Sequence, residues 1–227
     1  MAIKYETLLP DVISMVPACP EVIAERAIRA AAIELCEKTD VYQKQLDPIT
    51  VVANIYEYDL EPPQSTVVHR IVWMTHEGKP LEPVSSGLLE QRKENWRKDT
   101  GTPEYFIKQG LSTVHLVPVP SATISQGVEI RVALKPTQTS TSCDDEIMTD
   151  YRDAIINGAI FRLCRMPAKD WTDIGAAQIY SGLFSEGLLY AERRGRQADN
   201  PVVAKVRYGG LHAGRKTRKY AGRKSFI

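Results

Sequence analysis

Two helical patterns lie in series between Asp144 and Arg196, and they constrain the fold of this chain more than any other stretch. In the first, apolar residues recur at three- and four-residue spacing from Ile147 to Leu163, which predicts an amphipathic helix. The acidic residues at 144–146 supply the capping oxygens and the negative charge that a helix N-terminus favours. Pro167 is expected to end the helix, because proline disfavours helical geometry in the residue before it.

The second pattern begins near Asp170 and continues to the arginines that precede Gly195. Its predicted apolar face consists of Ile174, Ala177, Tyr180, Phe184, Leu188 and Ala191. Small residues occur where two helices would approach closely, namely Ala154, Gly158, Ala159, Ala176 and Ala177. We therefore predict an antiparallel helical hairpin, and its sequence contains no recognisable catalytic motif.

A third strong helix is predicted near the N-terminus, from Pro20 to Lys38. Proline is tolerated in a first helical turn, where its missing N–H has no helical partner in any case. The apolar face of this helix is rich in alanine, and charged residues cover its other side. A shorter helix is expected from Leu9 onward, so the chain begins with helices that can join the later hairpin.

From Asp47 the hydrophobic period changes from about 3.6 to 2, which indicates strands. The predicted strands cover residues 49–52, 55–60, 67–75, 81–84, 105–107, 113–117 and 128–134, and a short polar helix is expected over 86–98. The order helix, strands, helices is typical of an α+β protein with segregated layers and not of alternating βαβ units.

We therefore predict an α+β fold with a helical core, made of the N-terminal helix and the C-terminal helical hairpin, that carries an antiparallel β insertion and an extended C-terminal arm. The helical core is assigned to residues 1–46 and 142–198, the β-rich insertion to 47–141, and the basic C-terminal arm to 199–227.

The composition is that of an ordinary soluble globular protein, with 43% hydrophobic and 25% charged residues among 227. No apolar run reaches the length of a membrane span, and the N-terminus lacks the apolar region of a signal peptide. The cysteines are scattered and never occur as C-x-x-C, so we expect buried free thiols in a reducing compartment.

Charge is distributed unevenly along the chain. The net charge is +1, but the segment from Asn200 to Ile227 carries eight lysines and arginines and no acidic residue, so residues 1–199 carry −7. Few large apolar residues occur in this segment, which is expected to order only on a partner. Its candidate partner-binding residues are Lys205, Arg207, Tyr208, Arg215, Lys216, Arg218, Lys219, Tyr220, Arg223, Lys224, Phe226 and Ile227.

Three interpretations of the arm remain open. It can neutralise nucleic-acid phosphate, which requires only lysine and arginine at modest density. It can dock on another protein, with its charges on an acidic surface and its aromatic residues in pockets. It can also be a solvated tail. The interleaved aromatic residues favour docking.

No motif for catalysis, metal binding or cofactor binding is found. His76-Glu77 begins like H-E-x-x-H, but Pro80 stands where the second histidine would be. No phosphate-binding, dinucleotide-binding or nucleophile-elbow glycine pattern occurs. The carboxylates at 144–146 and Asp150 are explained by a capped helix start. The chain is therefore expected not to be an enzyme and to need no cofactor or metal.

Several stretches, in this order and spacing, resemble the head-to-tail adaptor proteins of short-tailed bacteriophages, which are related to tail tubular protein A. They are residues 19–21 with 30–39, 46–52 with 56–60, 101–106, 116–120, 132–136, and 151–155 ahead of 166–171. The resemblance covers about residues 10–190, and the segment after Asn200 has no matching counterpart.

The resemblance implies a structural virion protein, made in the bacterial host cytoplasm, that forms a ring, usually of twelve subunits, beneath the portal ring. Such adaptors join the portal protein to the tail nozzle protein, surround the channel through which genomic DNA leaves, and commonly grip the portal with terminal segments. We accordingly expect the C-terminal arm to dock on the portal. The alternative is a nucleic-acid-binding module that uses the same basic arm.

Overall fold

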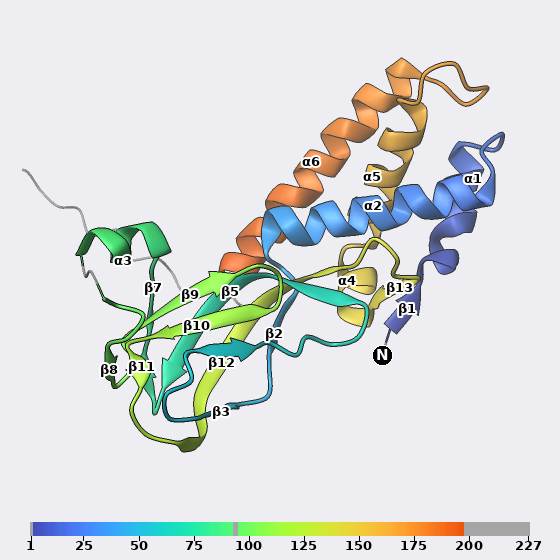
Figure 1. Ribbon diagram of the computed structural model, residues 1–227. Coiled ribbons are helices and arrows are strands. Elements are labelled where there is room, and N and C mark those ends of the chain that lie inside the picture. The colour runs from blue at the N-terminus through green and yellow to red at the C-terminus, as the bar shows by residue number, and fades with distance from the viewer. Residues whose placement is uncertain (1, 93–94, 198–227) are drawn as a thin grey trace, which may run out of the picture.

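The computed structural model describes residues 2–92 and 95–197. Helices gather at one end of the molecule and strands at the other (Figure 1). The helices are η1 Tyr5–Leu8, α1 Leu9–Met15, α2 Glu21–Thr39, α3 Ser86–Arg92, α4 Asp145–Asp150, α5 Arg152–Cys164 and α6 Ile174–Gln197. Helix α3 lies at the strand end, and the others form the helical end. No helix within the described ranges is long and apolar enough to cross a membrane.

Helix α2 follows the predicted N-terminal helix closely. Pro20 is its N-cap, and Asp40, with a left-handed φ of 50°, ends it by donating its backbone N–H to the carbonyl of Cys36. A left-handed residue of this kind satisfies a carbonyl that the helix leaves without a partner. The alanine-rich face is buried, with Ala24, Ala31 and Ala32 fully inaccessible.

The predicted hairpin is present, but its first helix is divided in two. Asp144 caps α4, and Tyr151, with φ −116° and ψ 22°, separates α4 from α5. Helix α5 then packs against both α6 and α2. Small residues make these contacts close, as predicted for Ala154: a Cβ on Gly187, which the sequence analysis did not single out, would lie 2.7 Å from the Cβ of Ala154.

The strands form two larger sheets and two small ones. The five-stranded sheet has the order β2-β12-β5-β6 with β3 also on β12, and its strands are β2 Gln43–Gln45, β3 Ile49–Val51, β5 Thr66–His76, β6 Lys79–Pro80 and β12 Ile124–Pro136. The four-stranded sheet has the order β4-β10-β9-β7, with strands β4 Glu57–Asp59, β7 Glu82–Pro83, β9 Tyr105–Gln109 and β10 Thr113–Val117. The small sheets pair β1 Ala2–Lys4 with β13 Ser142–Asp144 and β8 Thr100–Gly101 with β11 Val119–Pro120.

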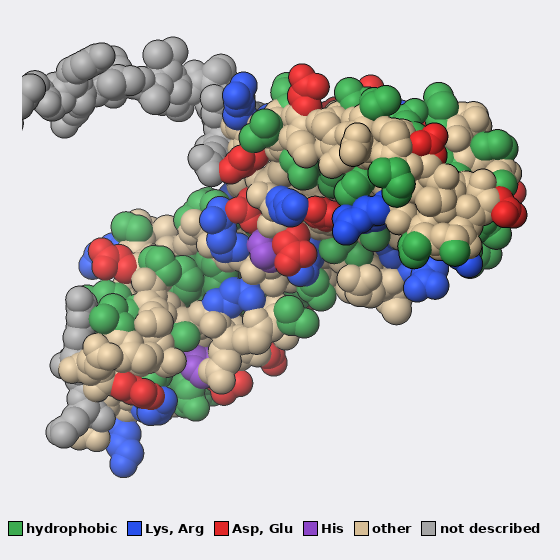
Figure 2. Space-filling model, turned by 90° about the horizontal axis from the view of Figure 1, so that it is seen from above, with side chains coloured by type: hydrophobic (Ala, Val, Ile, Leu, Met, Phe, Trp, Pro, Cys, Tyr) green, Lys and Arg blue, Asp and Glu red, His purple; other side chains and the backbone are tan. Residues whose placement is uncertain are grey.

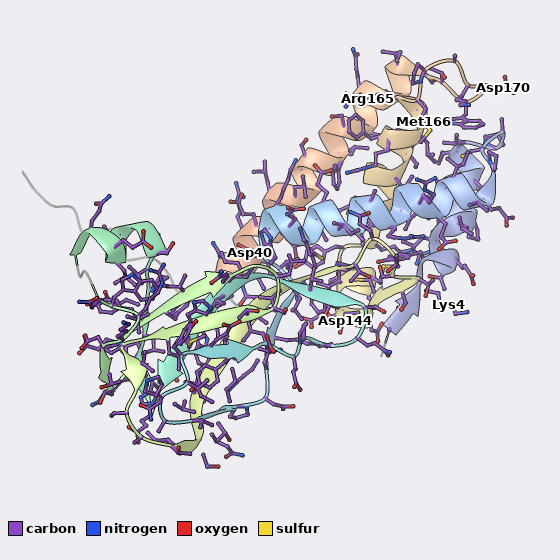
Figure 3. All side chains as sticks on the ribbon, viewed as in Figure 1. Lys4, Asp40, Asp144, Arg165, Met166 and Asp170 are labelled. Atoms are coloured by element: carbon purple, nitrogen blue, oxygen red, sulfur yellow. The ribbon has the colours of Figure 1, made fainter. Side chains whose placement is uncertain are left out.

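The helical and strand ends share one hydrophobic core. A single cluster of buried side chains extends from Leu8 and Ile28 in the helices to Ile130 and Leu134 in β12 and Leu116 in β10. Ion pairs cross the same junction. Asp40, at the end of α2 beside the strands (Figure 3), lies 2.7 Å from Arg70 of β5, and Glu37 lies 3.2 Å from Lys135 of β12. A smaller cluster of Leu89, Trp96, Ile107 and Val117 lies beneath α3.

The predicted fold class, a helical core with an antiparallel β insertion, is therefore wrong. The fold is mixed, with 40% helix and 30% strand, and the strands form several sheets instead of one appendage. Two of the pairings, β7 with β9 and β8 with β11, are parallel. The prediction failed because it treated the helices as a core complete in itself, whereas α2 packs on β12 and completes its burial there.

Candidate interaction surfaces

The described histidines do not form a catalytic site. His69 lies 3.8 Å from Asp40, His115 lies 3.7 Å from Glu57, and His76 is buried with its Nε2 unpaired. His69 and His76 belong to β5 and His115 to β10, and no group of three or more histidine, cysteine or acidic residues able to hold a metal occurs in residues 2–92 and 95–197.

The acidic residues that open the first hairpin helix have structural partners. The Asp144 carboxylate accepts a hydrogen bond from the backbone N–H of Glu146, which confirms the predicted helix cap. Burial opposes its ionisation, but the hydrogen bond and charge of Lys44, 2.8 Å away, outweigh that effect and lower the pKa of Asp144. Asp150 pairs with Arg194 of α6 at 2.7 Å. Asp144 therefore joins the start of α4 to strand β2 (Figure 3), whereas Asp150 joins α4 to α6.

Apolar side chains reach the surface along α6. Ile179, Leu183, Leu189 and Tyr190 are all exposed, on the side of the helix opposite the buried Phe184. Hydrophobic side chains accordingly interrupt the charged surface of the helical end (Figure 2). The predicted buried face of this helix is confirmed for Ala177, Phe184 and Ala191, but Ile174 at its start is exposed. Exposed apolar side chains gathered on one helix are typical of a surface that binds a partner.

A groove with arginine walls lies between α2 and α5. It has a volume of about 660 Å³ and is lined by Ile23, Arg26, Ala27, Arg29, Ala30, Gln138, Arg162 and Met166. Arg162 donates to the carboxylate of Glu34 and lies over the ring of Phe184, with 5.6 Å between its Cζ and the ring centroid. Burial raises the pKa of Glu34, but Lys38 and Arg162 outweigh it, so the pKa is lowered and the pair stays charged.

A second pocket lies at the strand end, where α3 meets the four-stranded sheet. It has a volume of about 450 Å³ and includes Tyr56, Trp96, Arg97, Lys108 and His115. Arg97 stacks on Trp96, and the ring of Tyr56 meets His115 edge to face. Burial lowers the pKa of Lys108, and the charge of Lys135 adds to that effect.

The predicted partner-binding residues, from Lys205 to Ile227, lie outside the residues that the structure describes. Their role therefore stays a prediction. The α6 face and the arginine groove were not singled out from the sequence. For the α6 face the sequence does contain a signal, because this helix carries more apolar residues than a single buried face can accommodate.

A comparison with known protein families identifies the class to which the chain belongs. A profile of the SU10 adaptor protein family matches residues 5–205. The chain therefore belongs to this family, a head-to-tail adaptor family of short-tailed phages, and the predicted resemblance is confirmed. No curated protein sequence matches the chain.

Membership in the family fixes the general role. The protein is a structural phage adaptor, and its family is not an enzyme family. The family implies a place in the virion, interaction with portal and tail, and oligomerisation.

Proposed function

We propose that the protein forms a ring of twelve copies beneath the portal and joins it to the tail nozzle. The observation that carries this proposal is the family match, which extends over residues 5–205 and so includes both the helical and the strand end. The apolar face of α6 supports a role in assembly, because an adaptor must bury surface against neighbours. Oligomers of this kind close by repeating one contact around an axis.

In this proposal the lumen of the ring carries the genomic DNA. Residues 1–199 have a net charge of −7 in each subunit, so a ring of copies places a large negative charge around the channel. Like charge repels phosphate and keeps DNA from adhering to the wall as it passes. The strand end, residues 47–141, faces the tail, and the helical segments face the portal.

The C-terminal arm, residues 199–227, docks on an acidic surface of the portal. Its eight basic residues supply the electrostatic attraction, and Tyr220, Phe226 and Ile227 anchor it in apolar pockets. The buried residues of the described core extend from Tyr5 to Ala191, so a chain ending at residue 199 should remain folded.

Light scattering tests the proposal directly. The mass of the full chain is measured alone and with portal rings, and the expected result is a portal complex that gains about twelve copies. A chain truncated after residue 199 should keep its circular dichroism and lose portal binding. Near-native portal binding by the truncated chain would exclude docking through the arm, and failure of the full chain to bind portal would exclude the adaptor ring.

A second candidate function is a nucleic-acid-binding module, which the uninterrupted positive charge of the arm favours. Binding of this kind is independent of sequence and weakens steeply with salt. Two variants separate the alternatives: one replaces Tyr220, Phe226 and Ile227 with serine, and the other replaces the eight basic residues with glutamine. Loss of portal binding in the serine variant supports docking. The alternative is supported if the wild-type chain does not bind portal and the serine variant still shifts duplex DNA at low salt.

A further inference from the structure

The outward face of α6 is mostly uncovered within the described chain, although the ring of Tyr190 lies 6.4 Å from that of Tyr151. Ile179 is 66% exposed and Tyr190 59%, and Leu183 and Leu189 lie on the same side. The opposite side of the helix packs inside the subunit, where Phe184 is buried against α5 and Gly187 lies against Ala154. A face of four large apolar side chains on a helix about 36 Å long is large enough to contribute one side of a stable interface.

Two glycines lie on this face where the subunit itself leaves room for a side chain. Gly175 and Gly182 are seven residues apart, so they lie on the same side of α6. A Cβ on Gly182 would meet nothing within 4 Å, and one on Gly175 would meet only the Asp173 side chain. Glycine destabilises a helix interior relative to alanine. A second protein surface that comes close to the backbone of α6 would account for a glycine at these positions, among exposed apolar side chains.

The charges of the two helical surfaces are complementary. Glu186, one turn from Gly182, is exposed and has no ion pair or hydrogen bond within the described ranges. In the groove between α2 and α5, Arg26 is likewise exposed without a described partner, and the Nε of Arg29 is buried without one. The lining of the groove also includes the small apolar residues Ala27 and Ala30. Glu186 lies near the middle of α6, and no acidic residue precedes it in the helix.

We propose that the outward face of α6 packs into the α2–α5 groove of a second copy of this chain, with Glu186 facing Arg26 of that copy. The inference rests on the proposed ring and names its contact surfaces. A closed ring needs two different faces on each subunit, because one face packed on itself closes a dimer. Helix α6 lies along one edge of the helical end and the groove opens between α2 and α5, so the two surfaces belong to different sides of one subunit (Figure 1).

A glycine substitution tests the close approach. Gly182→Gln leaves the isolated subunit folded, because the added side chain meets nothing there, but it blocks the approach of a second copy. Ile179→Asp with Leu183→Asp should reduce ring formation by about 100-fold or more, since it places charge in a buried apolar contact. Leu111→Asp is the matched control, because Leu111 is 60% exposed in the turn between β9 and β10, away from both surfaces. Rings of native size from the Gly182→Gln chain would overturn the proposal.

Charge reversal and cross-linking test which surfaces meet. Glu186→Arg or Arg26→Glu alone should weaken assembly by about tenfold, and the double swap should restore it. In rings assembled on portal, a chain with Arg26→Cys and Glu186→Cys should give a ladder of covalent oligomers with a short thiol cross-linker. Dimers from Glu186→Cys alone would show α6 packed on itself and overturn the proposal.

The outcomes separate this interface from the proposed function. Absence of any ring, with wild-type chain alone or with portal, contradicts the proposed function and the interface together. A native ring that gives no ladder and tolerates both charge reversals contradicts the interface alone, and the α6 face is then covered by portal or by the C-terminal arm.

Discussion

Gly158 of α5 lies directly against Phe184 of α6. A Cβ at residue 158 would lie 2.8 Å from Cε2 of Phe184 and 3.0 Å from the Cβ of Ala31. Neither neighbour can move away easily, because the phenyl ring of Phe184 is buried and the Cβ of Ala31 is attached directly to the buried backbone of α2. The three long helices therefore meet at a point where only glycine fits, and that point fixes how the helical end is packed.

Gly158→Ala should consequently destabilise the protein. The added methyl group would force the helices apart, and overpacking of this kind costs about 1–3 kcal/mol in the free energy of unfolding. Urea unfolding followed by circular dichroism measures the change. Unfolding at the wild-type midpoint would contradict the close packing of α5 on α6.

Gly182→Ala is the matched control, and its expected effect has the opposite sign. The same substitution, also within a helix, here meets open space in the subunit. Alanine favours a helix over glycine by up to about 1 kcal/mol. The monomer should therefore unfold at the same or a higher urea concentration, and destabilisation comparable to that of Gly158→Ala would show that the Gly158 effect is not one of packing.

Leu134→Ala tests whether the helical and strand ends share a core. Leu134 of β12 is fully buried in the cluster that also contains α2, and truncation at such a site costs about 2–5 kcal/mol. Because the core is shared, helix circular dichroism and tryptophan fluorescence should shift together to a lower midpoint. Two separate transitions, with only the strand end destabilised, would indicate independent units.

The long helices could be predicted because their signal is local. Apolar spacing and Pro20 locate α2 to within about two residues, the ordinary uncertainty of a helix end. The break at Tyr151 was missed, since the apolar period continues through it from Ile147 to Ile155.

The pairing of distant strands could not be predicted. Strand β1 pairs Ile3 with Cys143, and β2 pairs Lys44 with Val132, but each has only three residues and no alternating pattern of its own. Their register is set by the packing around them, which a local pattern does not encode. For the same reason the arginine groove was missed: Arg26 and Arg29 read as a solvated helix side until Arg162 of α5 is placed opposite them.

The cysteine thiols should be protected in the folded protein. All four are buried and free, which agrees with the prediction from their spacing. A hydrogen bond to Cys143 and burial raise the pKa of the Cys36 thiol, and burial raises that of Cys19 and Cys164. The thiolate is the reactive form, so little of it is present at neutral pH. An aromatic disulfide reagent should titrate four thiols only after denaturation, and a thiol that reacts rapidly without denaturant would contradict the buried positions.

Two substitutions of Asp144 separate its cap from its charge. Asp144→Ala removes the hydrogen bond to the N–H of Glu146 and the partner of Lys44, and should cost about 1–2 kcal/mol. Asp144→Asn keeps a side-chain oxygen for the cap, because asparagine caps a helix about as well as aspartate, and loses only the charge. Its destabilisation at neutral pH should be the smaller of the two in urea unfolding. Equal losses would mean that Lys44, and not the cap, accounts for the whole effect.

The same residue gives the stability a defined acid dependence. The pKa of Asp144 is lowered in the folded state by Lys44, so between the folded and unfolded pKa values the unfolded chain binds more protons. Its contribution is therefore fully present above the unfolded value, near pH 4, and is lost as the pH falls through the folded value. Asp144→Asn cannot titrate, so the difference in unfolding free energy between wild type and variant should shrink as the pH is lowered from about 5 to about 3. A difference that stays constant over this range would show that the carboxylate of Asp144 is not stabilised in its charged form by Lys44.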